Sequence, residues 1–416
     1  MLKKTLAGLG AALLLSATPI AVHAADLVIY HGWSSPAEVA ALNVLKGGLE
    51  AKGNTWTDLA IPHDSGANVS LINLVTGGNP PNAFMEASPD FYRDLLKQGK
   101  AIDLTQWFAD NHVTENLYKP VVEAITVDDK IVKVPVALGI DGMVYYNMAV
   151  AKDAGVDPTA WKSLDDMFAD FDKVKAKGYI PLAIGSQQWQ IAYLSHALAL
   201  AKEGPDFFEK IYGTKPDVSV FDSPEAADWL NLLRKIQQNT DAGTTNRDWN
   251  VTTNLVITGK ALMQMHGDWM KGEWVAAGKA AGTDFGCINI PGTKGLTLSI
   301  DAWGLLDGVS DEQKKAELDF AAVNVDPQIQ NAFAKAKGST PLRSDAPLDG
   351  IDQCSLAVIG ALKDPSITSF PTPHNTMNAD WESEVWNDLF AFWSDPAMTN
   401  EQTIQKLKDG YDAVFN

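Results

Sequence analysis

Residues 27–50 read LVIYHGWSSPAEVAALNVLKGGLE, and this stretch decides the fold class. The apolar run at 27–30 predicts a short buried strand. Polar and glycine residues follow it, and from Pro36 to Glu50 the apolar residues recur at helical spacing. The stretch therefore predicts a strand, a loop and a helix in that order.

The same alternation continues along the chain. Strands are predicted at 56–61 and 82–85, with a helix between them at 69–75 that Gly77 and Gly78 close. Strands that alternate with helices favour an α/β fold with a parallel sheet. Because 416 residues exceed one ordinary core, two domains are expected. Further helices are predicted at 163–177, 189–202, 223–238, 310–323, 381–393 and 401–413, and further strands at 131–136, 143–146, 261–265, 284–288 and 297–306.

The first 24 residues differ from the rest. Lys3 and Lys4 precede an apolar run from Leu6 to Leu15, and small residues follow as far as Ala24. This pattern predicts a secretory signal peptide over 1–24, because the apolar run is too short to span a bilayer. The alternative is a buried N-terminal helix. We expect an exported, soluble protein.

The charge of the chain argues against a nucleic-acid partner. Without the two lysines of the signal peptide, 31 basic and 52 acidic side chains give a net charge of 31 − 52 = −21. Binding to phosphates needs a basic face. No nucleophile elbow, zinc-binding H-E-x-x-H, P-loop or EF-hand loop is present, so we expect no catalytic residue, no metal and no cofactor.

Two cysteines, Cys287 and Cys354, allow one intramolecular pairing. An exported protein meets an oxidising compartment, where a disulfide is permitted. Two separately buried thiols are equally compatible with the sequence, so the pairing stays open at this stage.

Aromatic and charged residues gather after the predicted strands. Trp33 and Glu38 follow the first strand, Trp269 follows the strand at 261–265, and Asp301 lies within 297–306. Ligands of α/β sheets bind at the carboxyl ends of strands. A sugar presents an apolar C–H face that stacks on aromatic rings and hydroxyl groups that need charged partners. The pattern therefore points to a sugar site.

Motifs along the whole mature chain resemble one family, the extracytoplasmic solute-binding proteins of family 1, and within it the periplasmic glucose/mannose-binding type. The segment 31–38, HGWSSPAE, is similar to the family's H-W-W-T-S-G-G-E. The other matching segments, in order, are GNPPNA (78–83), GKAIDL (99–104), VPV (134–136), YN (146–147), GDW (267–269), FG (285–286), PGT (291–293) and KGSTPLR (337–343).

The resemblance implies a type II periplasmic binding protein fold, with two discontinuous α/β lobes joined by hinge strands. The N-terminal lobe would span 25–138 plus about 299–345, and the C-terminal lobe 139–298 plus about 346–416. A monomer in the periplasm would bind a sugar by lobe closure and deliver it to the membrane permease of an ABC importer. The implied ligand-binding residues are Trp33, Glu38, Trp269, Asp301, Lys337 and His374.

Several of these residues have an alternative structural interpretation. Glu38 suits the first turn of a helix, and Lys337 suits a helix end before Gly338. His374 lies between Pro373 and Asn375, and its alternative interpretation is a merely exposed loop histidine. We expect Asp268 to cap a helix rather than contact ligand. The residues expected only to pack are His31, His266, Arg343, Trp107, Trp161, Trp229 and Trp381.

The chain departs from the glucose-binding pattern at four positions. Gly32 replaces a tryptophan, Met85 aligns with a glutamine, and Gly139 and Ile140 replace a bulky cationic pair. These changes predict a reshaped pocket and a ligand other than glucose, such as another monosaccharide, a short oligosaccharide or a glycoside. A polyol or other small solute, and a glycoside hydrolase that uses Glu38 with Asp301, are the competing hypotheses.

Overall fold

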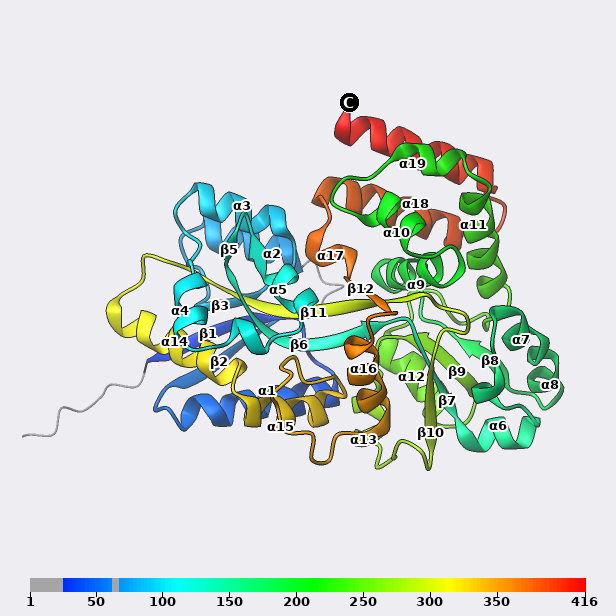
Figure 1. Cartoon of the computed structure of the whole chain (residues 1–416), viewed down its shortest axis with the longest axis horizontal. Coiled ribbons are helices and arrows are strands. Elements are labelled where there is room, and N and C mark those ends of the chain that lie inside the picture. The colour runs from blue at the N-terminus through cyan, green and yellow to red at the C-terminus, as the bar shows by residue number, and fades with distance from the viewer. Residues whose placement is uncertain (1–24, 62–66) are drawn as a thin grey trace, which may run out of the picture.

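The computed structural model describes residues 25–61 and 67–416. The predicted signal peptide lies outside the described residues. Two lobes lie on either side of a pair of long strands, β6 (Lys133–Asp141) and β11 (Gly295–Leu305), which cross from one lobe into the other (Figure 1).

The first lobe is built on a mixed sheet. Its strand order is β12-β11-β3-β1-β2, with β6 paired to β11. β1 pairs in parallel with β2 and β3, but β11 is antiparallel to β3 and β6 because it returns from the second lobe. The predicted parallel pairing is therefore confirmed for β1, β2 and β3, and β11 adds antiparallel pairs that the sequence analysis did not predict. The remaining strands are β1 (Asp26–His31), β2 (Thr55–Ala60), β3 (Ala83–Met85) and β12 (Thr368–Pro371).

The second lobe has its own sheet, in the order β10-β7-β9-β8. One residue, Gly142, joins β6 to the first of its strands in the chain. Gly142 has φ 69°, and a Cβ there would lie 2.0 Å from the Cβ of Ala197, so only glycine fits this turn. The strands are β7 (Met143–Asn147), β8 (Ile180–Ala183), β9 (Ala261–His266) and β10 (Phe285–Asn289). A small hairpin, β4 (Thr126–Val127) with β5 (Lys130–Ile131), lies apart.

Helices cover both sheets (Figure 1). Those around the first sheet are α1 (Pro36–Glu50), α2 (Ala67–Thr76), α3 (Pro89–Lys97), α4 (Thr105–Asp110), α5 (Lys119–Ile125), α14 (Asp311–Asn324) and α15 (Pro327–Lys337). Those of the second lobe are α6 (Met148–Ala154), α7 (Leu164–Ala169), α8 (Phe171–Ala176), α9 (Gln188–Lys202), α10 (Pro205–Tyr212), α11 (Pro224–Gln237), α12 (Trp249–Ile257), α13 (Met270–Ala276), α18 (Ala379–Ser394) and α19 (Asn400–Phe415). α16 (Gln353–Lys363) and α17 (Pro373–Thr376) lie near the crossing strands.

The helices predicted from periodicity are confirmed, with one correction. The segment 163–177 forms two helices, because the chain tightens at Asp170. There the backbone forms hydrogen bonds to the third preceding residue, as in a 3₁₀ turn. Asp170 N–H donates to Met167 O at 3.2 Å, and Lys173 N–H donates to Asp170 O at 3.1 Å. The Trp161 indole also donates to the Asp170 carboxylate at 2.8 Å.

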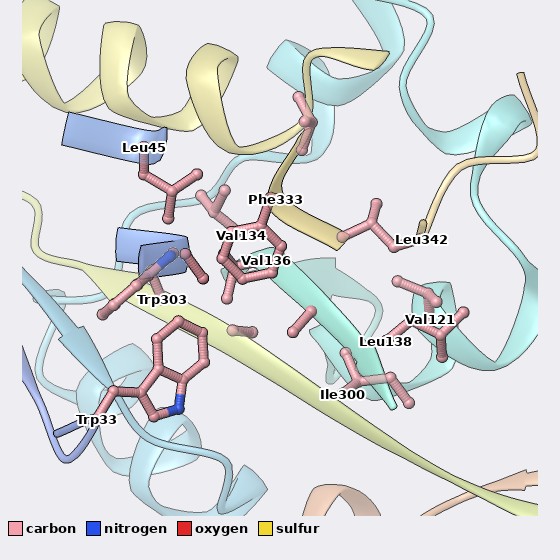
Figure 2. Close-up of a cluster of buried hydrophobic side chains, with 14 of the residues drawn as sticks. Trp33, Leu45, Val121, Val134, Val136, Leu138, Ile300, Trp303, Phe333 and Leu342 are labelled. Atoms are coloured by element: carbon pink, nitrogen blue, oxygen red, sulfur yellow. The ribbon is translucent and has the colours of Figure 1, made fainter. Parts of the chain in front are cut away.

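The core of the first lobe surrounds Trp303 of β11. Its ring makes an edge contact with Trp33 at 5.9 Å, and its indole N–H donates to Asn324 Oδ1 at 2.8 Å. Figure 2 shows Trp33 and Trp303 among the aliphatic side chains of both crossing strands, including Val134, Val136 and Ile300. The loop after β1 is therefore fixed by the same core that holds the crossing strands.

The crossing strands form a continuous antiparallel ladder. Its register runs from Thr297↔Asp141 to Gly304↔Lys133, with one shift between Asp301 and Ala302. The predicted lobe boundaries at 138/139 and 298/299 fall within this ladder, and they stay a prediction. At this shift Asp301 pairs with Ala137 and Ala302 with Pro135, so Val136 of β6 has no partner on β11.

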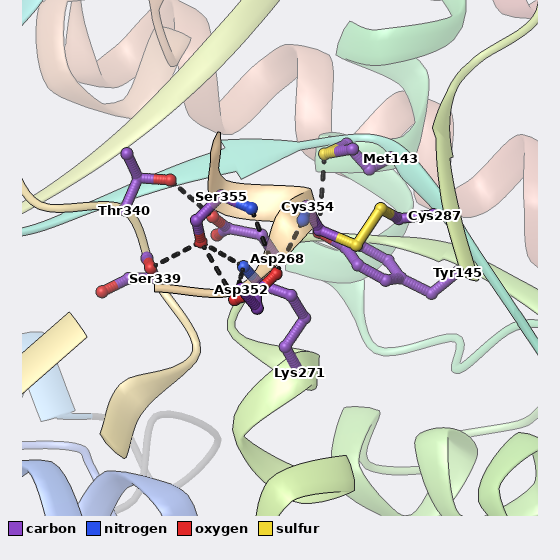
Figure 3. The surroundings of a disulfide bond; sticks show 10 residues. All are labelled: Met143, Tyr145, Asp268, Lys271, Cys287, Ser339, Thr340, Asp352, Cys354 and Ser355. Atoms are coloured by element: carbon purple, nitrogen blue, oxygen red, sulfur yellow. Dashed lines mark hydrogen bonds and ion pairs between the residues drawn. A yellow bond between two sulfur atoms is a disulfide. The ribbon is translucent and has the colours of Figure 1, made fainter. Parts of the chain in front are cut away.

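A disulfide joins Cys287 of β10 to Cys354 of α16, with a Cα–Cα distance of 6.0 Å (Figure 3). This settles the question that the sequence left open. Beside it, buried Lys271 of α13 forms an ion pair with Asp352 at 2.9 Å, and Ser355 donates to Ser339 O at 3.0 Å. The bridge and the Lys271–Asp352 pair tie α16 to the second lobe, while the Ser355 bond ties it to the segment after α15.

Within residues 25–61 and 67–416, no helix is long and apolar enough to cross a membrane.

Removal of the disulfide should lower stability. The bridge closes a loop with a sequence separation of 67, and loops of this size restrict the unfolded chain by about 2–4 kcal/mol. The double variant C287S/C354S should lose that much free energy of unfolding in urea titrations. A loss below about 0.5 kcal/mol would contradict a stabilising role.

Candidate ligand-binding site

Lys337 stands between the two lobes. It is the last residue of α15, and Gly338 ends the helix with φ 80°. The alternative interpretation of Lys337 as a lysine at a helix end before glycine is therefore also confirmed. Its ammonium lies 5.0 Å from the ring centroid of Trp33 and 6.0 Å from that of Trp269, which comes from the second lobe. Such contacts contribute about 0.5–2 kcal/mol. The side chain is only 5% exposed.

Glu38 fixes the start of α1. Its Oε2 accepts the backbone N–H groups of Ser34 and Ser35, each at 2.9 Å, and Ser35 completes a capping box. Its Oε1 lies 3.6 Å from Lys337 Nζ. The helix-start interpretation of Glu38 is therefore confirmed, and its carboxylate also neutralises the lysine. Contact with a ligand stays a prediction for both residues.

Trp269 lies directly after β9 and is partly exposed. Its ring rests on the β6 backbone at Gly139, where a Cβ would meet Asp268 Oδ1 at 2.9 Å and a Trp269 ring carbon at 3.1 Å. The absence of a side chain at Gly139 is thus what lets this ring lie close to the crossing strand. Two other positions also differ from the glucose-binding pattern. Ile140 is buried, and Met85 packs against the core of the first lobe.

Three aromatic residues that the sequence analysis missed extend this surface. Trp189 and Tyr193 of α9 have ring centroids 6.5 and 6.3 Å from Trp269, and Trp386 of α18 lies 6.1 Å from Tyr193. All three are partly exposed. Trp189 follows the carboxyl end of β8, but no strand was predicted at 180–183, so the rule that pointed to Trp33 and Trp269 did not reach it. Trp386 carries no comparable signal.

His374 and Asp301 lie at the other end of the ring cluster. His374 is 5.6 Å from Trp386, ring to ring, and its Nδ1 is 3.1 Å from both carboxylate oxygens of Glu382. Asp301 lies beside the register shift of the ladder, and its charge contributes to the raised pKa of the Tyr193 phenol, behind burial and Asp141. The structure therefore brings all six predicted residues to one junction, joined through Tyr193 and Trp386.

Asp268 does not cap α13. Its Oδ1 accepts the Ile140 N–H at 3.1 Å, while its own N–H donates to Ile140 O at 3.1 Å. The expected cap is wrong because the carboxylate turns inward to pin β9 to β6. Burial raises its pKa to about 7, against the opposing effect of Lys271. Asp141 is also buried, and burial raises its pKa well above the ordinary value.

The residues expected to pack do so. His31 and His266 end β1 and β9 and are buried, and burial lowers the pKa of His266 to about 3. Arg343 donates to Val325 O at 3.0 Å and pairs with Asp345. Trp161, Trp229 and Trp381 are buried, and Trp107 packs against Phe108 at the surface. In the described part of the chain, no group of three or more His, Cys, Asp or Glu side chains could hold a metal ion.

Two lobes joined by paired strands, with aromatic rings and fixed charges at their junction, define a two-lobed solute receptor. The chain belongs to the bacterial extracellular solute-binding protein family, whose model matches residues 62–353.

Individual relatives cover most of the chain. A probable sugar-binding periplasmic protein of Mesorhizobium japonicum is 35% identical over 370 residues, 87% of this chain and 87% of that protein. An ABC transporter extracellular-binding protein of Pyrococcus horikoshii is 28% identical, over 83% and 78% of the two chains. The solved structure of a chitin oligosaccharide binding protein matches with a TM-score of 0.79 at 20% identity, over 94% and 98%. This last match shows the same two-lobed fold.

Replacement of Lys337 should destabilise the junction. Lys337→Met leaves the buried Glu38 carboxylate without the cation beside its Oε1, which should cost about 3 kcal/mol in urea unfolding at pH 7. Lys335→Met on the same helix changes an exposed lysine and should stay within about 0.5 kcal/mol. Equal losses in the two variants would contradict this account of Lys337.

Addition of one methyl group at Gly139 should displace Trp269. Gly139→Ala should lower the free energy of unfolding by about 1–3 kcal/mol and shift tryptophan emission. Gly360→Ala in α16 is the control, because no atom lies within 4 Å of the place that its Cβ would take, and it should raise stability by about 0.5–1 kcal/mol. If Gly139→Ala were as stable as the control, the close contact would be refuted.

Proposed function

We propose that this protein is a periplasmic sugar receptor that captures a monosaccharide or small saccharide between its lobes and delivers it to an ABC importer. The observation that carries the proposal is the ring cluster at the junction, together with the Lys337–Glu38 and His374–Glu382 ion pairs. Partly exposed rings suit the apolar face of a sugar, and fixed charges suit its hydroxyl groups.

The relatives support the ligand class and the partner. One is named a probable sugar-binding periplasmic protein, another an uncharacterized ABC transporter extracellular-binding protein, and a structural neighbour a chitin oligosaccharide binding protein. Capture by lobe closure follows if the sugar binds the closed form better than the open form. The receptor acts as a monomer that presents both lobes to the permease.

The contacts of the Glu38 carboxylate suit a binding residue and not a catalytic acid. Both of its carboxylate oxygens are engaged, Oε2 by two backbone donors and Oε1 by Lys337. A glycoside hydrolase needs one carboxyl group that takes up and releases a proton. In Glu38 both oxygens are instead held by the helix start and by Lys337, so we expect chromogenic glycosides to stay intact in the presence of the protein.

Tryptophan fluorescence of the refolded, ligand-free protein tests the proposal. Titration with D-glucose, D-galactose, D-xylose, maltose and diacetylchitobiose should give a saturable change with at least one sugar. Trp269→Ala should weaken that binding about tenfold or more. Trp107→Ala, a matched change outside the junction, should leave it unchanged.

Two outcomes would contradict the proposal. Silence with every sugar, together with a saturable response to a polyol, glycerol phosphate or an amine, would assign the receptor to another ligand class. Equal weakening by Trp269→Ala and Trp107→Ala would move the site away from the junction.

A further inference from the structure

His374 is held by one helix in two ways. Its Nδ1 lies 3.1 Å from Oε1 and from Oε2 of Glu382, in the first turn of α18. One helical turn later, Trp386 places its ring 5.6 Å from the imidazole at an interplanar angle of 36°. The carboxylate and the indole together fix both the position and the orientation of the imidazole ring.

The start of α18 is itself anchored from the first lobe. The Ala379 N–H donates to Asp90 Oδ2 of α3 at 2.9 Å. Figure 1 shows α3 facing α17 and α18 across the junction. A carboxylate at a helix N-terminus is a favourable contact. The helix that holds His374 is therefore positioned by both lobes.

The charges around His374 come from four elements. Glu382 lies on α18, Glu86 follows β3, Lys133 and Asp141 lie on β6, and His196 lies on α9. Burial opposes the charged imidazolium, but Glu382 more than offsets it, and the pKa of His374 rises to about 9. Burial lowers the pKa of Lys133 to about 7 and that of His196 to about 3. Neither side chain therefore carries a full positive charge at neutral pH that would repel the His374 imidazolium.

The second ring nitrogen is available. Within residues 25–61 and 67–416, the imidazole of His374 forms hydrogen bonds through Nδ1 and none through Nε2, and the side chain is 27% exposed beside the ring cluster. A charged N–H donor forms hydrogen bonds about twice as strong as a neutral one.

We propose that Glu382 is a positioning residue that keeps His374 a cationic donor, so that Nε2–H binds an oxygen of the captured saccharide across the whole neutral pH range. This inference rests on the proposed function. It concerns Glu382, whose carboxylate is paired with His374, and it makes sugar affinity insensitive to pH between about 5.5 and 8.

The direction of the pH effect follows from the pair. In the wild type, His374 stays charged throughout this range. Glu382→Gln keeps the size of the side chain but removes its charge, so burial should outweigh the remaining effect of Glu86 and the pKa of His374 should fall below about 6.5. Its affinity for sugar should then approach the wild-type value at pH 5.5 and fall at least tenfold by pH 8. Glu382→Asp keeps the charge and should preserve a flat profile.

The experiment has two independent measurements. The pKa of His374 is followed by NMR of ¹⁵N-histidine-labelled protein without sugar, in the wild type, Glu382→Gln and Glu382→Asp. Sugar binding is followed by fluorescence from pH 5.5 to 8 with D-glucose, D-galactose, D-xylose and maltose as probes. Glu384→Gln on the same helix is the matched control and should leave both measurements unchanged.

The outcomes separate this inference from the proposed function. A pKa of His374 that stays above 8 in Glu382→Gln, or an affinity loss that is equal at every pH, would overturn the role of Glu382. If no probe binds the wild type at any pH, the proposed function fails and the role of His374 in sugar binding fails with it. The NMR measurement still decides whether Glu382 holds the proton.

The unfolding free energy gives a third measurement that needs no sugar. Because the pKa of His374 is raised above the ordinary 6.5, the pair contributes stability that is complete below pH 6.5 and is lost as pH rises through about 9. The stability difference between the wild type and Glu382→Gln should therefore shrink between pH 6.5 and 10. A constant difference would contradict the proposed pairing.

Discussion

The antiparallel ladder between β6 and β11 is the constraint on which the rest of the structure depends. These strands belong to the first sheet, yet they cross into the second lobe, where Gly142 turns the chain directly into β7. Every group at the junction is placed relative to this ladder. Trp269 lies on Gly139, Asp268 binds the backbone of Ile140, and Asp301 occupies the one shift in register. The pairing from Thr297↔Asp141 to Gly304↔Lys133 therefore spans the junction of the two lobes.

The junction combines apolar rings with charges that are already neutralised. Lys337 has Glu38 as its partner, and His374 has Glu382, so each cation sits beside a carboxylate. Such pairs offer strong donors to a ligand but little net charge, which suits a neutral polyhydroxyl molecule better than a phosphate. The acidic surface of the chain agrees with this preference, because it disfavours anions at long range. The rings of Trp189, Trp269 and Trp386 supply the apolar faces that complete the pattern.

The sequence predicted features that depend on local pattern. Helix α1 was expected at 36–50 and forms there, because its apolar period and its capping residues agree. The sequence predicted less well the features that depend on contacts between segments far apart in the chain. β6 was expected to end at 136, but pairing with β11 extends it to Asp141 through a stretch that has no alternation of its own. Trp386 was missed because only the packing of α18 turns that face toward Tyr193. Asp268 was misassigned because its partner, Ile140, lies 128 residues away.

Binding of the ligand between the two lobes can be observed by ¹⁹F NMR of protein labelled with 5-fluorotryptophan. The chain has 13 tryptophans, and single Trp→Phe variants assign their resonances. On saturation with a sugar that binds in the fluorescence titration, we expect shifts for Trp189, Trp269 and Trp386, while Trp229 and Trp381 in the core of the second lobe stay unchanged. Saturable binding that moved only Trp107, or none of the three junction tryptophans, would contradict a site between the lobes.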